Sequence, residues 1–142
     1  MNRISLTQAN AMIEAAFAKG GELGLKPLAV TIHDPGGHMI AAQRQDGASN
    51  MRIKLAAGKA CGALSLGVSS RTIGNMARDR PHFVASVDQM GEGGMVPAAG
   101  GVIACDADGA IMGAIGVTGD TSDNDEACAL AAIEAVGLKP LN

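Results

Sequence analysis

The residues of this 142-residue chain best suited to chemistry include three histidines, His33, His38 and His82. Imidazole is a frequent metal ligand and titrates nearest to neutral pH, so all three are candidate metal ligands. His33 is also a candidate for proton transfer in a catalytic role. His33 and His38 flank one predicted turn, and side chains at opposite ends of a tight hairpin more often face solvent, which argues against a shared metal ion.

Two cations, Arg44 and Lys59, suggest an anion site. A bidentate arginine with a nearby lysine suits a carboxylate or another anionic group. In the alternative interpretation Arg44 pairs with Asp46, and Lys59 extends its ammonium group to solvent. The residue types alone do not decide between the two.

Glycines near the cations would let a ligand approach the backbone closely. We therefore predict a ligand site between the helix that bears Lys59 and two glycine-rich strands, lined by Gly100, Gly101, Gly116 and Thr118. Glu126 is a second candidate for proton transfer. The acidic segment 116–126 that contains it is also typical of a helix start, with Asp123 as N-cap, because carboxylates complement the helix dipole.

The spacing of apolar and turn residues predicts the elements that must position these groups. In chain order they are a helix over 5–20, strands over 28–33 and 38–44, helices over 50–66 and 70–78, strands over 102–105 and 111–117, and a helix over 123–136. Segment 82–90 fits either a helix or a strand. The order α-ββ-αα-ββ-α predicts an α/β protein of the α+β kind, with helices on an antiparallel sheet, since tight turns cannot join parallel strands.

Composition limits the function classes. The length and the 47% hydrophobic content predict one folded domain over residues 1–142. A net charge of −3 and only two aromatic side chains argue against nucleic acid as a partner. No apolar run suits a signal peptide or a membrane span, which predicts a cytoplasmic protein. The abundance of small residues limits the apolar area that one subunit can bury, so we expect a homo-oligomer.

Five motifs occur in order along nearly the whole chain. They are Val30-x-x-x-Asp34-Pro35-Gly36-Gly37, Arg44-x-Asp46-Gly47, Ala57-x-Lys59-Ala60, Gly100-Gly101-Val102, and Gly113-Ala114-Ile115-Gly116-Val117-Thr118-Gly119 followed by Asp125-Glu126. Together they resemble the GlcG/HbpS family, which includes the C-terminal domain of PduO-type proteins. The chain departs from that pattern at Ile103, where proline is common, and at Thr118, where serine is usual.

The resemblance implies a profilin-like antiparallel sheet flanked by helices, and homo-oligomers from dimers up to octamers. Some members of the family bind or degrade haem, so haem is a candidate cofactor, and others accompany operons of small-molecule catabolism. We therefore expect a cytoplasmic protein that binds a small anionic molecule or haem. The alternatives are a small lyase or isomerase acting on a carboxylate-bearing or aromatic metabolite, and a scaffold subunit without a ligand.

Overall fold

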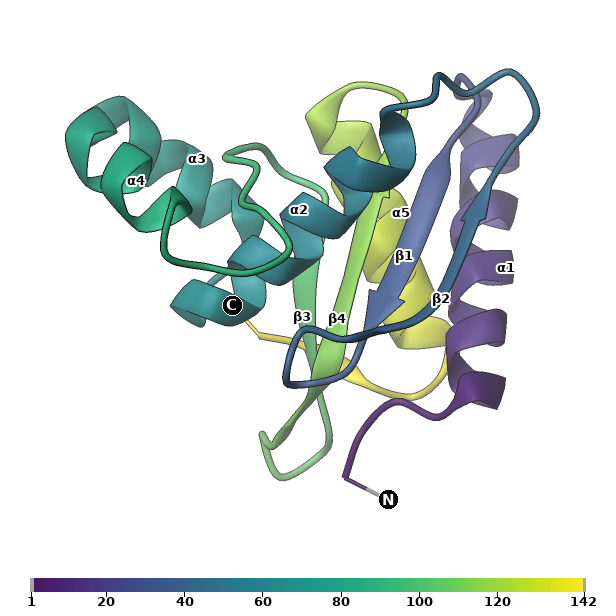
Figure 1. Ribbon diagram of the computed structural model, residues 1–142. Coiled ribbons are helices and arrows are strands. Elements are labelled where there is room, and N and C mark those ends of the chain that lie inside the picture. The colour runs from purple at the N-terminus through teal and green to yellow at the C-terminus, as the bar shows by residue number, and fades with distance from the viewer. Residues whose placement is uncertain (1, 142) are drawn as a thin grey trace.

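The computed structural model describes residues 2–141 (Figure 1). Its elements are α1 (Leu6–Leu23), β1 (Ala29–His33), β2 (Met39–Arg44), α2 (Arg52–Leu66), α3 (Ser70–Asp79), α4 (Pro81–Asp88), β3 (Gly101–Cys105), β4 (Ile111–Thr118), α5 (Ser122–Ala135) and β5 (Lys139–Pro140). The predicted α+β class and element order are confirmed. Segment 82–90, which suited either a helix or a strand, lies mostly in α4. The two-residue strand β5 was not predicted.

The five strands form one antiparallel sheet in the order β2-β1-β4-β3-β5. Two hairpins, β1–β2 and β3–β4, meet where β1 pairs with β4. The register of β1 and β2 shifts between Ile32 and His33, where one strand carries an additional residue. The regular register therefore ends at Ile32, and His33 pairs with Met39 beyond the shift, next to the turn that leads into β2.

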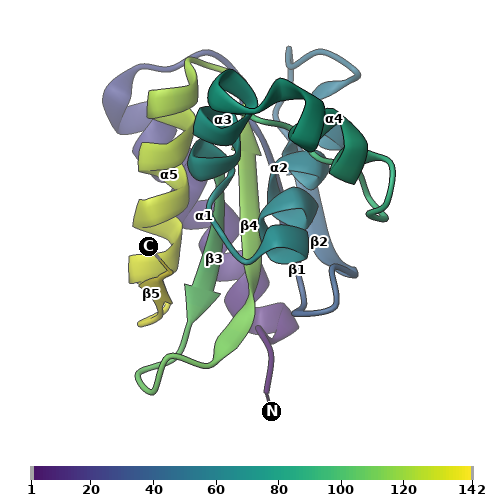
Figure 2. The same ribbon diagram turned by 90° about the vertical axis from the view of Figure 1, so that its left-hand side faces the viewer.

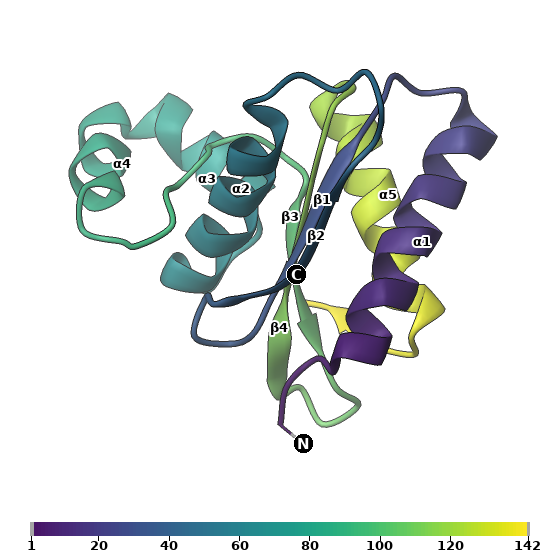
Figure 3. The ribbon, with the colours of Figure 1, turned by 45° about the vertical axis from the view of Figure 1, so that its right-hand side comes forward.

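Helices cover both faces of the sheet. Helices α1 and α5 lie together on one face, and α2 lies on the other (Figure 3). Helices α3 and α4 lie beyond α2 and extend away from the sheet (Figures 1 and 2). Side chains alternate along each strand, so Val30 and Ile32 pack toward α1 and α5, while Thr31 and His33 face α2. This alternation sends the polar side chains of β1 toward α2.

Helix α2 packs against the sheet with backbone close to backbone. A methyl group added to Gly116 would overlap the Ala56 carbonyl group, and one added to Gly101 would overlap the carbonyl group of Lys59. On the far side of α2, Gly58 and Gly62 lie against Val96 and Met95 of the loop before β3. The small residues thus allow close contact on two sides of one helix.

The helix ends show which capping predictions were accurate. Ser5 and Gln8 form the predicted capping box of α1. The Ser5 hydroxyl group accepts from the Gln8 amide at 3.1 Å, and Gln8 Oε1 accepts from the Ser5 amide at 3.0 Å. Helix α5 begins earlier than predicted, because Thr121, and not Asp123, is its N-cap and accepts from the Asn124 amide. Asp123 lies in the first turn instead, where its charge still favours the helix dipole.

No helix in residues 2–141 combines the length and the apolar character needed to cross a membrane.

Candidate functional site

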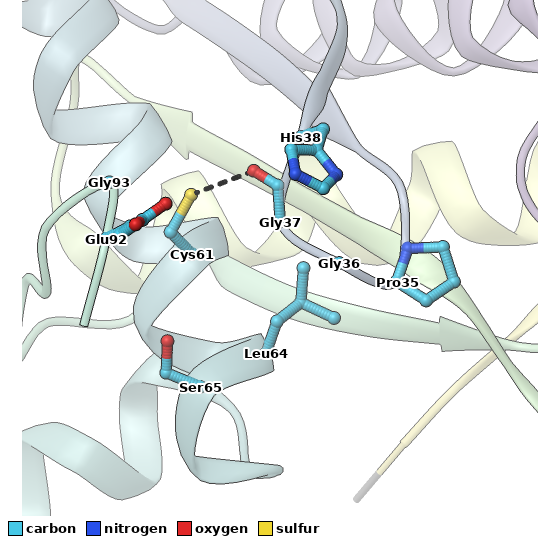
Figure 4. A pocket seen from close by; sticks show the side chains of 9 residues that line it. All are labelled: Pro35, Gly36, Gly37, His38, Cys61, Leu64, Ser65, Glu92 and Gly93. Atoms are coloured by element: carbon cyan, nitrogen blue, oxygen red, sulfur yellow. Dashed lines mark hydrogen bonds between the residues drawn. The ribbon is translucent and has the colours of Figure 1, made fainter.

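A pocket of about 420 Å³ lies between the β1–β2 turn, helix α2 and the loop before β3 (Figure 4). We call it the turn pocket. It is lined by Pro35, Gly36, Gly37, His38, Cys61, Leu64, Ser65, Glu92 and Gly93. It contains an imidazole, a thiol and a carboxylate, and it is therefore the candidate site.

Asp34 organises the turn that carries His38. Its Oδ1 accepts the amide hydrogens of Gly36 at 2.9 Å and His38 at 3.0 Å, while its own amide donates to the His38 carbonyl oxygen. The same Oδ1 lies 3.3 Å from His38 Nδ1. The His38 side chain is 80% exposed, while its Nδ1 faces Asp34. The turn therefore presents Nε2 to solvent beside the pocket.

His33 lies behind the turn and is only 2% exposed. Its Nδ1 donates to the Gly37 carbonyl oxygen at 3.1 Å, and its Nε2 lies 3.0 Å from the Thr31 hydroxyl group. Since a carbonyl oxygen only accepts, the proton belongs on Nδ1, and Nε2 accepts from Thr31. Burial lowers the pKa of His33, because a charged ring would lose its hydration. Both nitrogens of this predicted metal-ligand and proton-transfer candidate are thus engaged.

Cys61 lines the pocket from helix α2. Its thiol donates to the Gly37 carbonyl oxygen at 3.5 Å (Figure 4). Its Sγ also lies 3.6 Å from His33 Nδ1. Burial raises the pKa of the thiol, which therefore stays protonated near neutral pH. Sequence patterns do not indicate Cys61 or Glu92 as site residues, because only the close packing of α2 against the turn and the loop brings them to His38.

The structure separates Arg44 from Lys59, which the sequence analysis placed in one anion site. Lys59 is 4% exposed, and its Nζ donates to Asp125 at 3.2 Å and to the Val117 carbonyl oxygen at 3.0 Å. Burial lowers the pKa of Lys59 and raises that of Asp125, so each charge depends on its partner. Arg44 is exposed and donates to Asn50 at 3.2 Å. Lys59 therefore does not extend to solvent, and Arg44 bonds to Asn50 in place of the expected Asp46.

Helix backbone and side chains occupy the space where the sequence analysis expected a ligand. Gly101 and Gly116 contact the backbone of α2, and Gly100 lies against Lys59 and the Val117 carbonyl oxygen. The Thr118 hydroxyl group accepts from Arg52 at 3.1 Å. Close helix packing thus accounts for the glycines that were predicted to line a ligand site.

The remaining candidates lie apart from the turn pocket. Glu126 accepts hydrogen bonds from Arg71 Nε at 3.0 and 3.1 Å, and it shares no contact with His33. His82 is exposed on α4. In the described part of the chain, no group of three or more His, Cys, Asp or Glu side chains could hold a metal ion. The three histidines therefore do not form a common metal site.

The burial of His33 predicts a pH-dependent stability. The unfolded chain, with an ordinary histidine pKa of 6.5, binds more protons than the folded state wherever the pH lies between that value and the lowered folded pKa. The free energy of unfolding should therefore fall as the pH falls below 6.5 through this interval. Urea unfolding at pH 5 to 8 checks this, and a His33→Asn variant with the same pH dependence as the wild type would contradict it.

The chain is similar to a known protein family and to several solved structures. A family model described as haem degrading protein HbpS-like matches residues 4–134. The structure resembles the crystal structure of a PduOC:heme complex, with a TM-score of 0.85, 22% sequence identity and coverage of 99% of both chains. It also resembles Klebsiella pneumoniae protein ORFY, with a TM-score of 0.82 and 24% identity over 94% of this chain and 90% of that one.

The crystal structure of HbpS gives a TM-score of 0.81 and 26% identity, and covers 95% of this chain and 91% of the HbpS chain. A comparison with curated proteins found no significant match. Because the family model spans nearly the whole chain, and the fold agrees with it, the chain belongs to the HbpS-like family.

Proposed function

We propose that the protein binds haem at the turn pocket, where His38 Nε2 would be a protein ligand of the iron. The observation that carries the proposal is the arrangement of this ring, whose Nδ1 faces Asp34 while Nε2 is open to solvent. Histidines that ligate metals usually donate their other ring N–H group to a carboxylate or carbonyl oxygen, which orients the ring. One histidine suffices as a protein ligand for haem iron, so the absence of a three-residue metal cluster among the described residues is compatible with this role.

The other pocket residues fit an amphipathic ring system. Leu64 and Pro35 offer apolar surface, while Ser65 and Glu92 place polar groups on the lining. The volume of about 420 Å³ lies within the range of roughly 300 to 1,000 Å³ that is usual for small-molecule sites. When bound, haem would supply a redox-active iron, and the chain's own residues would bind it and orient it.

Family membership supports the same ligand, since the matching model is described as haem degrading and one similar structure is a haem complex. The proposal includes self-association, a cytoplasmic location and a role in small-molecule catabolism. Self-association is supported by the small-residue composition, since such a subunit buries little apolar area alone.

Haem titration followed by visible absorbance tests the proposal. The chain contains no Trp or Tyr, so strong near-ultraviolet or visible bands belong to the ligand. We expect a Soret band that saturates at a fixed ratio of haem to subunit. His38→Ala should shift or remove this band, because the proposed nitrogen donor to the iron is lost.

The matched control is His82→Ala, which removes an exposed histidine from α4 and should leave the spectrum unchanged. Identical titrations of the wild type and His38→Ala would show that His38 is not the ligand. A broad spectrum that never saturates would indicate adsorption and contradict specific binding.

A further inference from the structure

The geometry points to His33 as a positioning residue that holds the turn bearing His38 in place through the Gly37 carbonyl group. This inference rests on the proposed role of His38 as a haem ligand. It gives His33 a task that differs from metal ligation and from proton transfer. The residue has no direct contact with the proposed ligand atom and acts through the backbone.

The turn has a well-defined internal shape but few connections to the rest of the molecule. Asp34 bonds to the amides of Gly36 and His38, and its carbonyl oxygen accepts from the Gly37 amide at 2.9 Å. Gly37 adopts a φ of 86°, which favours glycine. Two consecutive glycines also make the segment intrinsically flexible. Hydrogen bonds within the turn therefore set its shape. Its orientation relative to the rest of the protein needs another contact.

Regular strand pairing supplies little of that contact, because the β1–β2 register shifts between Ile32 and His33, directly before the turn. The His33 side chain supplies it instead, by donating from Nδ1 to the Gly37 carbonyl oxygen at 3.1 Å. Thr31 fixes the ring from the other side at 3.0 Å, and both residues belong to the buried strand β1. The buried strand β1 is thus connected to the residue just before His38 by one hydrogen bond, and Thr31 holds the ring that makes it.

Cys61 adds a second, weaker connection to the same carbonyl oxygen, at 3.5 Å. Cys61 also lines the pocket. The Gly37 carbonyl oxygen therefore joins β1, α2 and the turn at one point. Loss of the His33 donor would leave only a thiol, which is a weak hydrogen-bond donor.

The test compares two substitutions of His33 in the full chain. His33→Leu removes the donor. His33→Asn keeps one, because the Asn side-chain nitrogen Nδ2 is bonded to Cγ, as Nδ1 is in histidine. We expect His33→Leu to weaken haem affinity by about tenfold or more, which is the usual effect of losing a residue that orients a metal ligand. His33→Asn should restore most of the affinity and the wild-type Soret position.

Amide hydrogen exchange in the haem-free protein provides a readout that does not depend on haem. The amides of Gly37 and His38 should exchange faster in His33→Leu than in the wild type, and more slowly again in His33→Asn. Equal exchange at these amides in all three proteins would overturn the inference, as would equal haem affinity and spectra.

The two hypotheses can fail separately. If His38→Ala binds haem like the wild type, the proposed ligand is wrong, whatever the His33 variants show. If His38→Ala loses the Soret band but His33→Leu keeps both affinity and spectrum, only the positioning role is wrong. A purely structural role predicts a lower melting temperature for both His33 variants, with no rescue of affinity by His33→Asn.

Discussion

Replacing Gly116 with alanine is expected to destabilise the folded protein by about 3 kcal/mol or more, at the upper end of the usual cost of overpacking. The new methyl group would overlap the Ala56 carbonyl group of α2. The backbone fixes the position of the new methyl group, and the Ala56 carbonyl group belongs to the backbone of α2, so neither partner can rotate away. Relief would require α2 to move off the sheet, which would also stretch the bond from Lys59 to the Val117 carbonyl oxygen. Urea unfolding followed by far-ultraviolet circular dichroism measures the loss.

Gly21→Ala is the matched control. Gly21 lies in α1, where an added methyl group meets no atom within 4 Å. Alanine there should stabilise the protein by about 0.5 to 1 kcal/mol, because it restricts the unfolded chain and favours the helix. If both glycine substitutions changed the free energy of unfolding equally, close packing of α2 at Gly116 could not be the cause of the destabilisation.

Replacing Lys59 with methionine is expected to cost about 3 to 5 kcal/mol, the usual penalty for leaving one charge of a buried pair without its partner. Asp125 is 1% exposed and would keep only the Asp120 amide, at 3.0 Å, as a donor. Its pKa, already raised by burial, should rise further without Lys59. Because the protonated carboxyl group is then favoured by folding, the stability deficit of the variant should shrink as the pH falls.

Two variants make this result specific. Lys54→Met removes an exposed cation from the same helix and should change stability by no more than about 0.5 kcal/mol. Adding Asp125→Asn to Lys59→Met removes the orphan charge but keeps an acceptor for Asp120, so it should recover much of the loss. A deficit that is independent of pH and persists in the double variant would mean that Lys59 stabilises the protein through packing alone.

These two predictions concern the residues that the sequence analysis assigned to ligand binding. Glycines opposite a lysine suggested an open anion site, and the same residue types also suit a helix packed tightly on a sheet. Sequence could not separate the two, because the distinction depends on whether the helix backbone fills the space beside Gly101 and Gly116. The ion-pair partner of Lys59 could not be predicted either, because Asp125 lies 66 residues further along the chain.

The candidate site was partly visible in the sequence. The Asp34-Pro35-Gly36-Gly37 turn and the histidines beside it were recognised, because turn residues and alternating apolar residues are local signals. The different environments of His33 and His38 could not be recognised from the sequence. A register shift and the alternation of side chains place one ring beneath the turn and leave the other exposed.

The sequence by itself determined the α+β class, the two hairpins, the capping box at Ser5 and the family resemblance, because periodicity, turn chemistry and ordered motifs act over short stretches of chain. Tertiary structure alone decided which polar residues meet. It paired Lys59 with Asp125, bonded Glu126 to Arg71 and brought Cys61 to the turn. Such contacts depend on the packing of whole elements across the sheet, and the energy of a buried charge or hydrogen bond depends on that environment and not on residue type alone.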